Sequence, residues 1–315
     1  MNRNSELLRD AEKLLCVKSN DVDVILKEHK VSQKQLQDII DLIQDWYDKQ
    51  PHLPKNGLED RIIVQLLISS KFRIEKVKDK IDAAISAKHK MPEFLLNRDP
   101  LSPNISEYLI DGFFAILPKL SQDNHRVSIF RLKSPREFVM NDVIKLAFMM
   151  LEYRRYNDVH FGDQYIHDLS NIRFSNTVQM TPPVITKMMY YLRFCTGAKI
   201  KGIHFINMPT FVVPIVALVK KLLKPKIAAR IYIHSKPEDI AKMYPKNILP
   251  KEYGGDDYSI DEIAENWTTT LQSDAWRQYY RDQEKVVSDE SKRTRVLSCD
   301  EFFGCEGSFR KLEFD

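Results

Sequence analysis

The residues best suited to acid–base chemistry are three histidines, His167, His204 and His234, and the neighbouring Asp168. An imidazole or a carboxylate in a cleft can move a proton for a substrate. Each histidine lies in a different strand-like segment, however, and no nucleophile, second base or oxyanion-binding loop stands at a fixed spacing from any of them. We therefore interpret these side chains as structural, with a general-base role for Asp168 as the less favoured alternative. The sequence does not favour an enzyme.

Sequence motifs that bind nucleotides or metals are absent. The chain has only 9 glycines, and none of them forms the G-x-G-x-x-G or G-x-x-x-x-G-K-[ST] loop that holds phosphates. Neither a G-x-S-x-G nucleophile elbow nor an H-E-x-x-H zinc motif occurs. No histidine stands at metal-binding spacing from the one close pair of cysteines, so we expect reduced thiols and no cofactor or metal. The cysteines are Cys16, Cys195, Cys299 and Cys305.

Four basic residues have the spacing to bind phosphate groups. Lys199 and Lys201 share one face of an extended segment, because alternate side chains of a strand point the same way. Lys226 and Arg230 share one face of a helical turn. Each basic residue near an anionic bilayer contributes about 1 kcal/mol of binding free energy. The alternative is a solvated face, which spacing alone favours. The formal net charge of +4 is too small to predict a nucleic acid partner.

A nearly unbroken apolar run, residues 211–219, lies in a predicted helix over residues 210–223. At a rise of 1.5 Å per residue this helix is about 21 Å long, and a bilayer core is roughly 30 Å thick. The helix does not span a membrane, yet its first two turns lack a polar face and must be covered on both sides. A plain core helix is one interpretation. The other is an apolar ligand or a membrane surface on one side, which Pro209, Pro214 and the flanking lysines favour.

The elements that position these residues change in type along the chain. Before about residue 126 the pattern predicts only helices, the first of which begins at a capping box formed by Ser32 and Gln35. After residue 126, strands alternate with helices, which indicates βαβ units and a largely parallel sheet. The predicted strands are 126–132, 164–170, 202–207 and 230–234, and the predicted helices are 141–153, 183–196, 210–223 and 260–282.

The two ends of the sequence are polar. The first residues lack the apolar core and cleavage site of a secretory signal, and no apolar run reaches the length of a bilayer span. We therefore expect a soluble, intracellular protein. The segment from Ser288 onward is rich in charge, and we expect little fixed structure in it.

Three segments in the second half of the chain resemble a known family. They are KIKGIHFINMPTF (199–211), LLKPKIAARIYIH (222–234) and ILPKEYGG (248–255). With the order of strands and helices before them, they resemble the CRAL-TRIO lipid-binding family, in the branch of the α-tocopherol transfer protein and the cellular retinaldehyde-binding protein. The resemblance covers roughly residues 100–275. The ending GSFRKLEFD resembles the tail of insect members of this branch.

The helices before this region resemble the small domain that usually precedes the CRAL-TRIO fold. The segment LLISSKFRIEKV stands at the place of its signature, where Ser69-Ser70-Lys71-Phe72 replaces the usual arginine-rich sequence. The resemblance thus implies an all-helical N-terminal domain (1–98), a lipid-binding domain (99–282) and a charged C-terminal tail (283–315).

The resemblance implies an α/β fold in which a mostly parallel sheet floors a closed apolar cavity, with the apolar helix as a mobile gate over it. It also implies that a basic patch beside the gate binds phosphoinositide phosphates, which outweighs the solvated-face interpretation. The patch residues would be Lys199, Lys201, Lys226 and Arg230.

Nine residues are implied as the lining of the cavity, and all of them are apolar here. They come from the helices that flank the sheet, from the third strand and from the inner side of the gate. The tocopherol carrier has a small polar residue where this sequence has Met149, which leaves the ligand open. The nine are Met149, Phe174, Val178, Met188, Leu192, Ile203, Val212, Ile215 and Leu218.

These features predict an intracellular carrier, expected to be a monomer, that binds a tocopherol, retinoid, carotenoid or related terpenoid and exchanges it at a membrane. Phosphoinositide binding would shift the carrier toward release. One alternative is a phospholipid carrier or sensor of the same fold, which needs polar groups in its pocket. Another is a regulatory module that binds other proteins.

Overall fold

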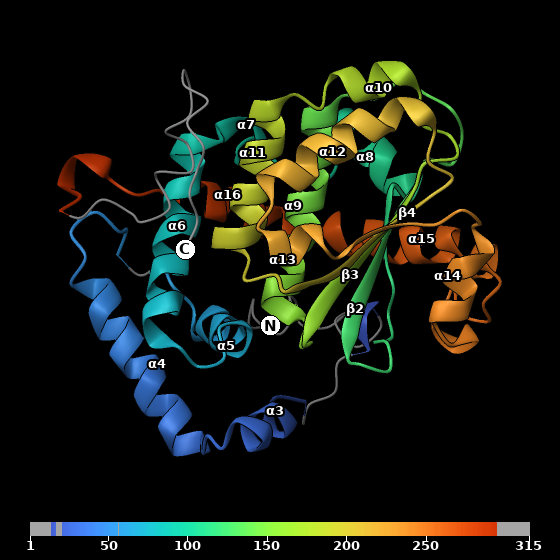
Figure 1. Cartoon of the computed structure of the whole chain (residues 1–315). Coiled ribbons are helices and arrows are strands. Elements are labelled where there is room, and N and C mark those ends of the chain that lie inside the picture. The colour runs from blue at the N-terminus through green and yellow to red at the C-terminus, as the bar shows by residue number, and fades with distance from the viewer. Residues whose placement is uncertain (1–13, 17–20, 56, 295–315) are drawn as a thin grey trace.

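The strands assemble into one five-stranded sheet in the order β1-β2-β3-β4-β5. The structure, a computed structural model, describes residues 14–16, 21–55 and 57–294. Strands β2 to β5 run parallel, and β1 is antiparallel to β2; Figure 1 labels β2, β3 and β4. The largely parallel sheet predicted from the sequence is confirmed. The strands are β1 Phe114–Ile116, β2 His125–Phe130, β3 Gly162–Asp168, β4 Ile200–Ile206 and β5 Ile231–Ile233.

Two rows of side chains cross one face of the sheet from β2 to β5. Alternate residues of a strand point to the same face, so the register of the strands fixes which side chains meet. We call this surface the cavity face. Its first row is Ser128, Tyr165, Ile203 and Ile231, and its second row is Phe130, His167, Phe205 and Ile233.

The expectation that no strand precedes residue 126 is wrong, because β1 lies at Phe114–Ile116. This strand is apolar throughout and too short to display the alternation by which a strand is predicted. It follows α8 through a turn at Gly112, whose φ of +66° favours glycine. The pairing of β1 with β2 supplies the backbone hydrogen bonds that a segment of this length cannot make alone.

The chain before the sheet is helical, as predicted. The side chain of Ser32 accepts from the backbone N–H of Gln35, and the Gln35 side chain accepts from the N–H of Ser32, so the predicted capping box is present. The helices of this region are α3 Asp21–His29, α4 Gln33–Asp48, α5 Asp60–Ser69, α6 Ile74–Lys90, α7 Pro92–Leu95 and α8 Pro103–Ile110.

The remaining predicted helices follow in the predicted order, but the short helices at Phe174–Val178, Pro225–Ala228 and Glu238–Met243 were not predicted, and two predicted helices differ in form. The predicted helix 183–196 is α-helical only to Tyr190 and ends in a π-helical turn, η1. The predicted helix 260–282 is two helices, because the Ser273 side chain accepts from the N–H of Trp276 and begins a new one. These elements are α9 Met140–Asn157, α10 Phe174–Val178, α11 Pro182–Tyr190, η1 Tyr191–Cys195, η2 Thr210–Val212, α12 Val213–Leu222, α13 Pro225–Ala228, α14 Glu238–Met243, α15 Ile260–Leu271 and α16 Asp274–Lys285.

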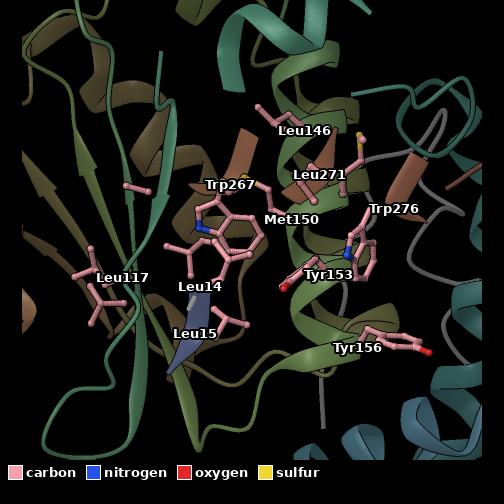
Figure 2. Close-up of a cluster of buried hydrophobic side chains, with 14 of the residues drawn as sticks. Leu14, Leu15, Leu117, Leu146, Met150, Tyr153, Tyr156, Trp267, Leu271 and Trp276 are labelled. Carbon is pink, nitrogen blue, oxygen red and sulfur yellow. The ribbon is translucent and has the colours of Figure 1, made fainter. Parts of the chain in front are cut away.

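The main core joins α9 to the two C-terminal helices through aromatic rings. Tyr153 of α9 packs between Trp267 of α15 and Trp276 of α16, with ring centroids 4.9 and 4.5 Å apart (Figure 2). Aromatic pairs at such distances add about 0.5–1.5 kcal/mol each beyond the area that they bury. Aromatic packing thus fixes the position of α9 relative to α15 and α16.

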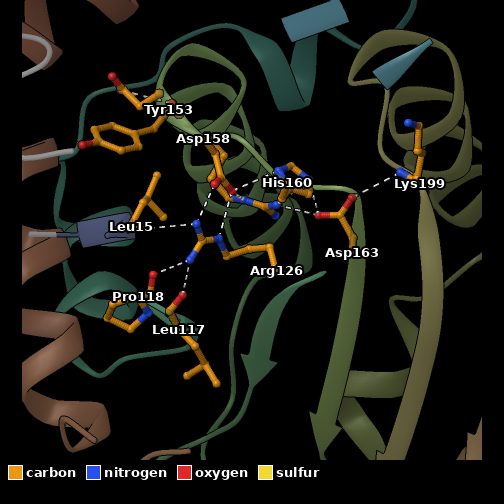
Figure 3. A network of polar contacts seen from close by, with 11 residues as sticks. Leu15, Leu117, Pro118, Arg126, Tyr153, Asp158, His160, Asp163 and Lys199 are labelled. Carbon is orange, nitrogen blue, oxygen red and sulfur yellow. Dashed lines mark hydrogen bonds and ion pairs between the residues drawn. The ribbon is translucent and has the colours of Figure 1, made fainter. Parts of the chain in front are cut away.

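Ion pairs fix α9 to the sheet. The guanidinium of Arg126, on β2, is fully buried and bonds both carboxylate oxygens of Asp158, which follows α9, at 3.0 and 2.6 Å. Its remaining N–H groups donate to the carbonyls of Leu15, Leu117 and Pro118 (Figure 3). Every donor of this buried cation is therefore satisfied, as burial of a charge requires.

The segment after α16 packs against the N-terminal helices. The amine of Lys88 on α6 donates to the carbonyl of Val286 at 2.5 Å, and Arg293 donates to both oxygens of Asp82 at 2.9 Å. The expectation of little fixed structure from Ser288 onward is therefore wrong for residues 288–294. Side-chain partners on α6 order them. The rest of the expected tail, residues 295–315, lies outside the described residues.

Replacing Arg126 should destabilise the fold strongly. In Arg126→Met the carboxylate of Asp158 keeps its burial but loses the cation that Arg126 supplied, and breaking such a pair costs about 3–5 kcal/mol of unfolding free energy. Urea unfolding followed by tryptophan fluorescence measures this loss. The matched control is Lys133→Met, because Lys133 and Asp261 form an exposed ion pair worth about 1 kcal/mol or less. Equal losses in the two variants would contradict the assigned importance of the buried pair.

Candidate functional site

The apolar helix closes over the cavity face. We call residues 210–222, which comprise η2 and α12, the gate segment. Its Val212 and Val216 are buried in one cluster with Ile203 of β4 and Ile231 of β5. Pro214 lies in the first turn of α12, where a missing N–H costs no helical hydrogen bond. The gate segment therefore rests on the sheet through a small apolar contact.

The outer surface beside the gate segment also carries apolar side chains. Val213 of α12 is 49% exposed, and Phe174 and Val178 of α10 are 63% and 59% exposed. The ring of Phe174 meets that of Phe211 edge-on, with centroids 5.9 Å apart. Helices α10 and α12 lie close together in Figure 1. We call Phe174, Val178 and Val213 the exposed apolar set, since side chains of this kind together mark an interaction surface.

A cavity of about 60 Å³ lies between the cavity face and α9. Its walls are almost entirely apolar, and α9 contributes Ala147, Met150 and Leu151. The polar side chains on its walls are Ser128, Tyr165 and His167. The complete lining is Phe114, Ile116, Ser128, Phe130, Ala147, Met150, Leu151, Tyr165, Ile166 and His167.

The nine predicted pocket residues fall into several places around this cavity, and none of them borders it. Ile203 and Val212 belong to the cluster under the gate segment, while Ile215 and Leu218 are half-buried on α12. Phe174 and Val178 are exposed on α10. Met188 packs against a second core cluster, and Leu192 is half-buried in η1.

Met149 of α9 does not border the cavity. It is fully buried, and its carbonyl accepts from the hydroxyl of Tyr280 at 3.0 Å. Its neighbour Met150 borders the cavity instead. Adjacent residues of a helix point about 100° apart, and the local sequence is too uniformly apolar to tell which methionine faces the sheet.

The polar groups of the cavity are uncharged near neutral pH. Burial, and then the nearby His204, lower the pKa of His167 to about 4, so its imidazole is neutral. The rings of Phe130 and Phe205 flank this imidazole at centroid distances of 5.7 and 5.0 Å. The cavity therefore presents hydrogen-bonding groups but no formal charge.

The four predicted phosphate-binding residues have different surroundings. The amine of Lys199 donates to the carbonyl of Ile68 on α5 at 3.1 Å, and the guanidinium of Arg230 donates to the carbonyl of Ile200. Lys201 and Lys226 are exposed. The Ile203 N–H donates to the carbonyl of Arg230 at 2.9 Å, which holds Arg230 beside β4.

A further lysine, missed in the sequence, lies near this group. Burial lowers the pKa of Lys199, and the charges of Lys71 and Lys201 lower it further. Lys71 therefore adds positive potential from the N-terminal helices. A Cβ at Gly162 would lie 2.4 Å from Cγ of Lys201, so a larger residue there would displace the Lys201 side chain. The sequence signal for Lys71 was its place in the SSKF segment (69–72), where the resembled family has an arginine-rich sequence.

Membrane-spanning helices and metal sites can be assessed only in the part of the chain that the structure describes. Its helices include none that is both long and apolar enough to cross a bilayer. The same residues contain no group of three or more His, Cys, Asp or Glu side chains placed to hold a metal ion. Cys299 and Cys305 lie outside them.

Two family models match separate parts of the chain. A model described as the CRAL/TRIO domain matches residues 111–255, which include the sheet and the gate segment. A model described as a Pinta-like, UBA domain matches residues 32–105, the helices before the sheet. The domain boundaries expected at residues 98 and 282 stay predictions.

Several characterised proteins are similar to this chain. An alpha-tocopherol transfer protein-like protein of Mus musculus is 25% identical over 246 residues, 76% of this chain and 68% of that protein. Clavesin-1 of Xenopus laevis is 23% identical over 231 residues, 69% of this chain and 67% of that protein. The crystal structure of Sfh5 aligns with a TM-score of 0.43 at 11% identity, covering 64% of this chain and 74% of the other.

A charge under the gate segment should loosen it. In Val216→Asp a carboxylate replaces a buried side chain, and an unpaired buried charge costs several kcal/mol. We expect backbone amides of residues 211–223 to exchange with deuterium at least about tenfold faster, while β3 and β4 keep their protection. Ala217→Asp is the matched control, since Ala217 is exposed on the same helix. Equal exchange in the two variants would contradict the packing of Val216.

Proposed function

Because the chain carries a CRAL/TRIO domain, the lipid-binding domain of a family of lipid-transfer proteins, we propose that it carries a tocopherol, retinoid, carotenoid or related terpenoid between membranes. The observation that carries the proposal is the gate segment. It is an apolar helix that packs by a few side chains on an apolar sheet face beside an apolar cavity. The role is binding and transfer, not catalysis.

The physics of apolar transfer favours such a carrier. At about 0.8 kcal/mol per buried CH₂, a lipid of about twenty carbons gains more than ~15 kcal/mol on leaving water. Pockets for ligands of that size measure about 300–1,000 Å³, and the cavity measures about 60 Å³. The cavity must therefore enlarge to admit a ligand, and we propose that the gate segment beside it moves to allow this. An opening that faces a membrane spares the lipid any contact with water.

We propose that the gate segment opens at an anionic membrane. The exposed apolar set can enter the membrane interface, and the exposed amines of Lys201 and Lys226 can bind phosphates there. Each such charge is worth about 1 kcal/mol, which gives reversible binding. The side chains of Lys199 and Arg230 donate to backbone carbonyls. These two residues contribute to membrane binding mainly through their positive potential.

A phospholipid carrier is the second candidate, and the composition of the cavity disfavours it. A buried phosphate needs a cation or several donors. The residues that line the 60 Å³ cavity include no lysine or arginine. Their three polar side chains suit a small uncharged group better than a phosphodiester.

Retention of a lipid tests the proposed function directly. The purified full chain is incubated with liposomes made from a total lipid extract, isolated again and analysed by native mass spectrometry. We expect one terpenoid per chain. A chain that stays empty, or that retains only phospholipid, would contradict the proposal. The Val216→Asp variant should retain at least tenfold less lipid than Ala217→Asp, because its gate is open.

Removing the two exposed amines tests the membrane patch. In Lys201→Ala/Lys226→Ala the affinity for liposomes that contain phosphatidylinositol bisphosphate should fall by about tenfold or more, since each charge contributes about 1 kcal/mol. Sedimentation with liposomes measures this affinity. The control variant, Lys242→Ala/Lys251→Ala, removes two other exposed lysines. Equal losses in both variants would indicate nonspecific attraction and contradict the patch.

A further inference from the structure

A polar cavity lies apart from the cavity face, where the N-terminal helices meet the rest of the chain. It measures about 40 Å³, and α5, α6, α9, η1 and α16 all contribute to its walls. Figure 1 shows α6, α16 and α9 beside one another at this place. None of its lining residues borders the 60 Å³ cavity or belongs to the gate segment or the predicted basic patch. We call it the junction cavity.

The charges around the junction cavity do not balance. Its walls carry the cations Lys88, Arg98 and Arg155 and the carboxylate of Glu152. Glu284 of α16 adds a second carboxylate nearby, which accepts from the backbone N–H of Arg98 at 2.7 Å. Three cations therefore face two carboxylates. Lys88, Arg98 and Glu152 are only 8%, 3% and 5% exposed, and a buried charge without a counter-ion is costly.

Each of the three cations has N–H groups to spare among the described residues. Arg98 donates from Nη1 to Glu152, while its buried Nε has no partner. Lys88 has three N–H groups and donates to the carbonyl of Val286 at 2.5 Å. The guanidinium of Arg155 donates to one backbone carbonyl at 3.4 Å, and its Nη2 lies 3.6 Å from Glu152, which is too far for a hydrogen bond. Spare donors thus stand on α6, on α9 and on the loop after α7.

The charge of Lys88 depends on pH. Burial lowers the pKa of Lys88 to about 8. The charges of Glu152 and Glu284 raise this pKa, and those of Arg98 and Arg155 lower it. Below about pH 8 the amine is a cation, and the group carries one positive charge in excess. Above it the amine is neutral, and two guanidinium groups face two carboxylates. An anion in the junction cavity is therefore favoured most below pH 8.

The size of the junction cavity selects a small ligand. One buried water molecule needs about 10–15 Å³, so a cavity of about 40 Å³ holds a few waters or one small oxyanion. A lipid headgroup or a nucleotide is much larger. Lysine and arginine bind the oxygens of phosphate and sulfate through short, charge-assisted hydrogen bonds. A tetrahedral anion can accept from donors that come from several directions, as they do here.

We propose that the junction cavity binds one small tetrahedral oxyanion, phosphate or sulfate, through Lys88, Arg98 and Arg155. The bound anion supplies the negative charge that the walls lack, and its oxygens accept from the spare donors. It connects α6 to α9, so it holds the N-terminal helices against the lipid-binding domain. The inference goes beyond the proposed function and does not depend on it, because no residue of the site belongs to the gate segment or lines the apolar cavity.

Titration of the full chain with sodium sulfate tests the site. Sulfate keeps the same charge between pH 7 and pH 9, so a change in its affinity across this range comes from the protein. Sodium gluconate holds the ionic strength constant, because gluconate is too large for the cavity. By isothermal titration calorimetry we expect one sulfate per chain at pH 7. At pH 9 the affinity should be about tenfold lower, since a pKa of about 8 leaves only about a tenth of the Lys88 amines charged.

Lys88→Met removes the charge and keeps an unbranched side chain. We expect its sulfate affinity at pH 7 to be about tenfold lower than that of the wild type, and to be the same at pH 9. The matched control is Lys76→Met, which removes an exposed lysine from the same helix and should bind sulfate like the wild type. Urea unfolding verifies that the variants are folded. The pH series of the wild type tests the site even if Lys88→Met does not fold.

The outcomes separate the site from the membrane patch and from lipid transport. Lys201→Ala/Lys226→Ala should keep sulfate binding, and its loss in that variant would place the anion at the membrane patch and overturn the inference. A wild type that binds no sulfate, which would leave only water in the cavity, also overturns it, as does an equal affinity at pH 7 and pH 9. Chloride that displaces sulfate at equal concentration overturns the oxyanion class. A chain that retains no terpenoid overturns the proposed function alone.

Discussion

The buried ion pairs at the end of α9 are the constraint on which the rest of the structure depends. Arg126, Asp158, Arg154 and Asp163 join β2, α9 and β3 through one network of buried ion pairs. A buried charge tolerates little displacement, because a lost partner leaves a desolvated ion. The helix that roofs the cavity is thereby tied to the strands that floor it. Aromatic packing of Tyr153 on Trp267 and Trp276 holds the same end of α9.

The opposite end of the cavity face is held much less firmly. The gate segment contacts the sheet through aliphatic side chains such as Val212 and Val216, and β5 beneath it has only three residues. Aliphatic contacts are non-directional, so they can separate and form again without leaving a polar group unpaired. A cavity that must open and close needs one rigid region and one segment that can move, and this sheet carries both. This division lies in the chemistry of the contacts more than in the secondary structure.

Much of the architecture could be predicted from the sequence, because hydrophobic periodicity and helix capping depend on residues that are close in the sequence. The capping box at Ser32 predicted the start of its helix, and the alternation of strands and helices predicted a parallel sheet. Features that depend on distant partners could not be predicted. The strand at Phe114–Ile116 exists because β2 pairs with it, and residues 288–294 are ordered because Asp82 and His89 bind them. The choice of Met150 over Met149 as a cavity residue depends on the rotation of α9. The side chains of Lys199 and Arg230 donate to backbone carbonyls. This could not be predicted either, because the sequence does not show which carbonyl lies within reach of a lysine or arginine.

The contact between Arg293 and Asp82 has a consequence for how the protein is made. The two residues are 211 positions apart in the chain. At a synthesis rate of about 5–20 residues per second, Asp82 waits about 10–40 s on the ribosome for its partner. During that time the carboxylate of Asp82 and the amine of Lys88 lack their C-terminal partners and can bind other groups. The N-terminal helices can therefore complete their packing only after the last part of the chain has been translated, and a chain that stops early leaves them unfinished.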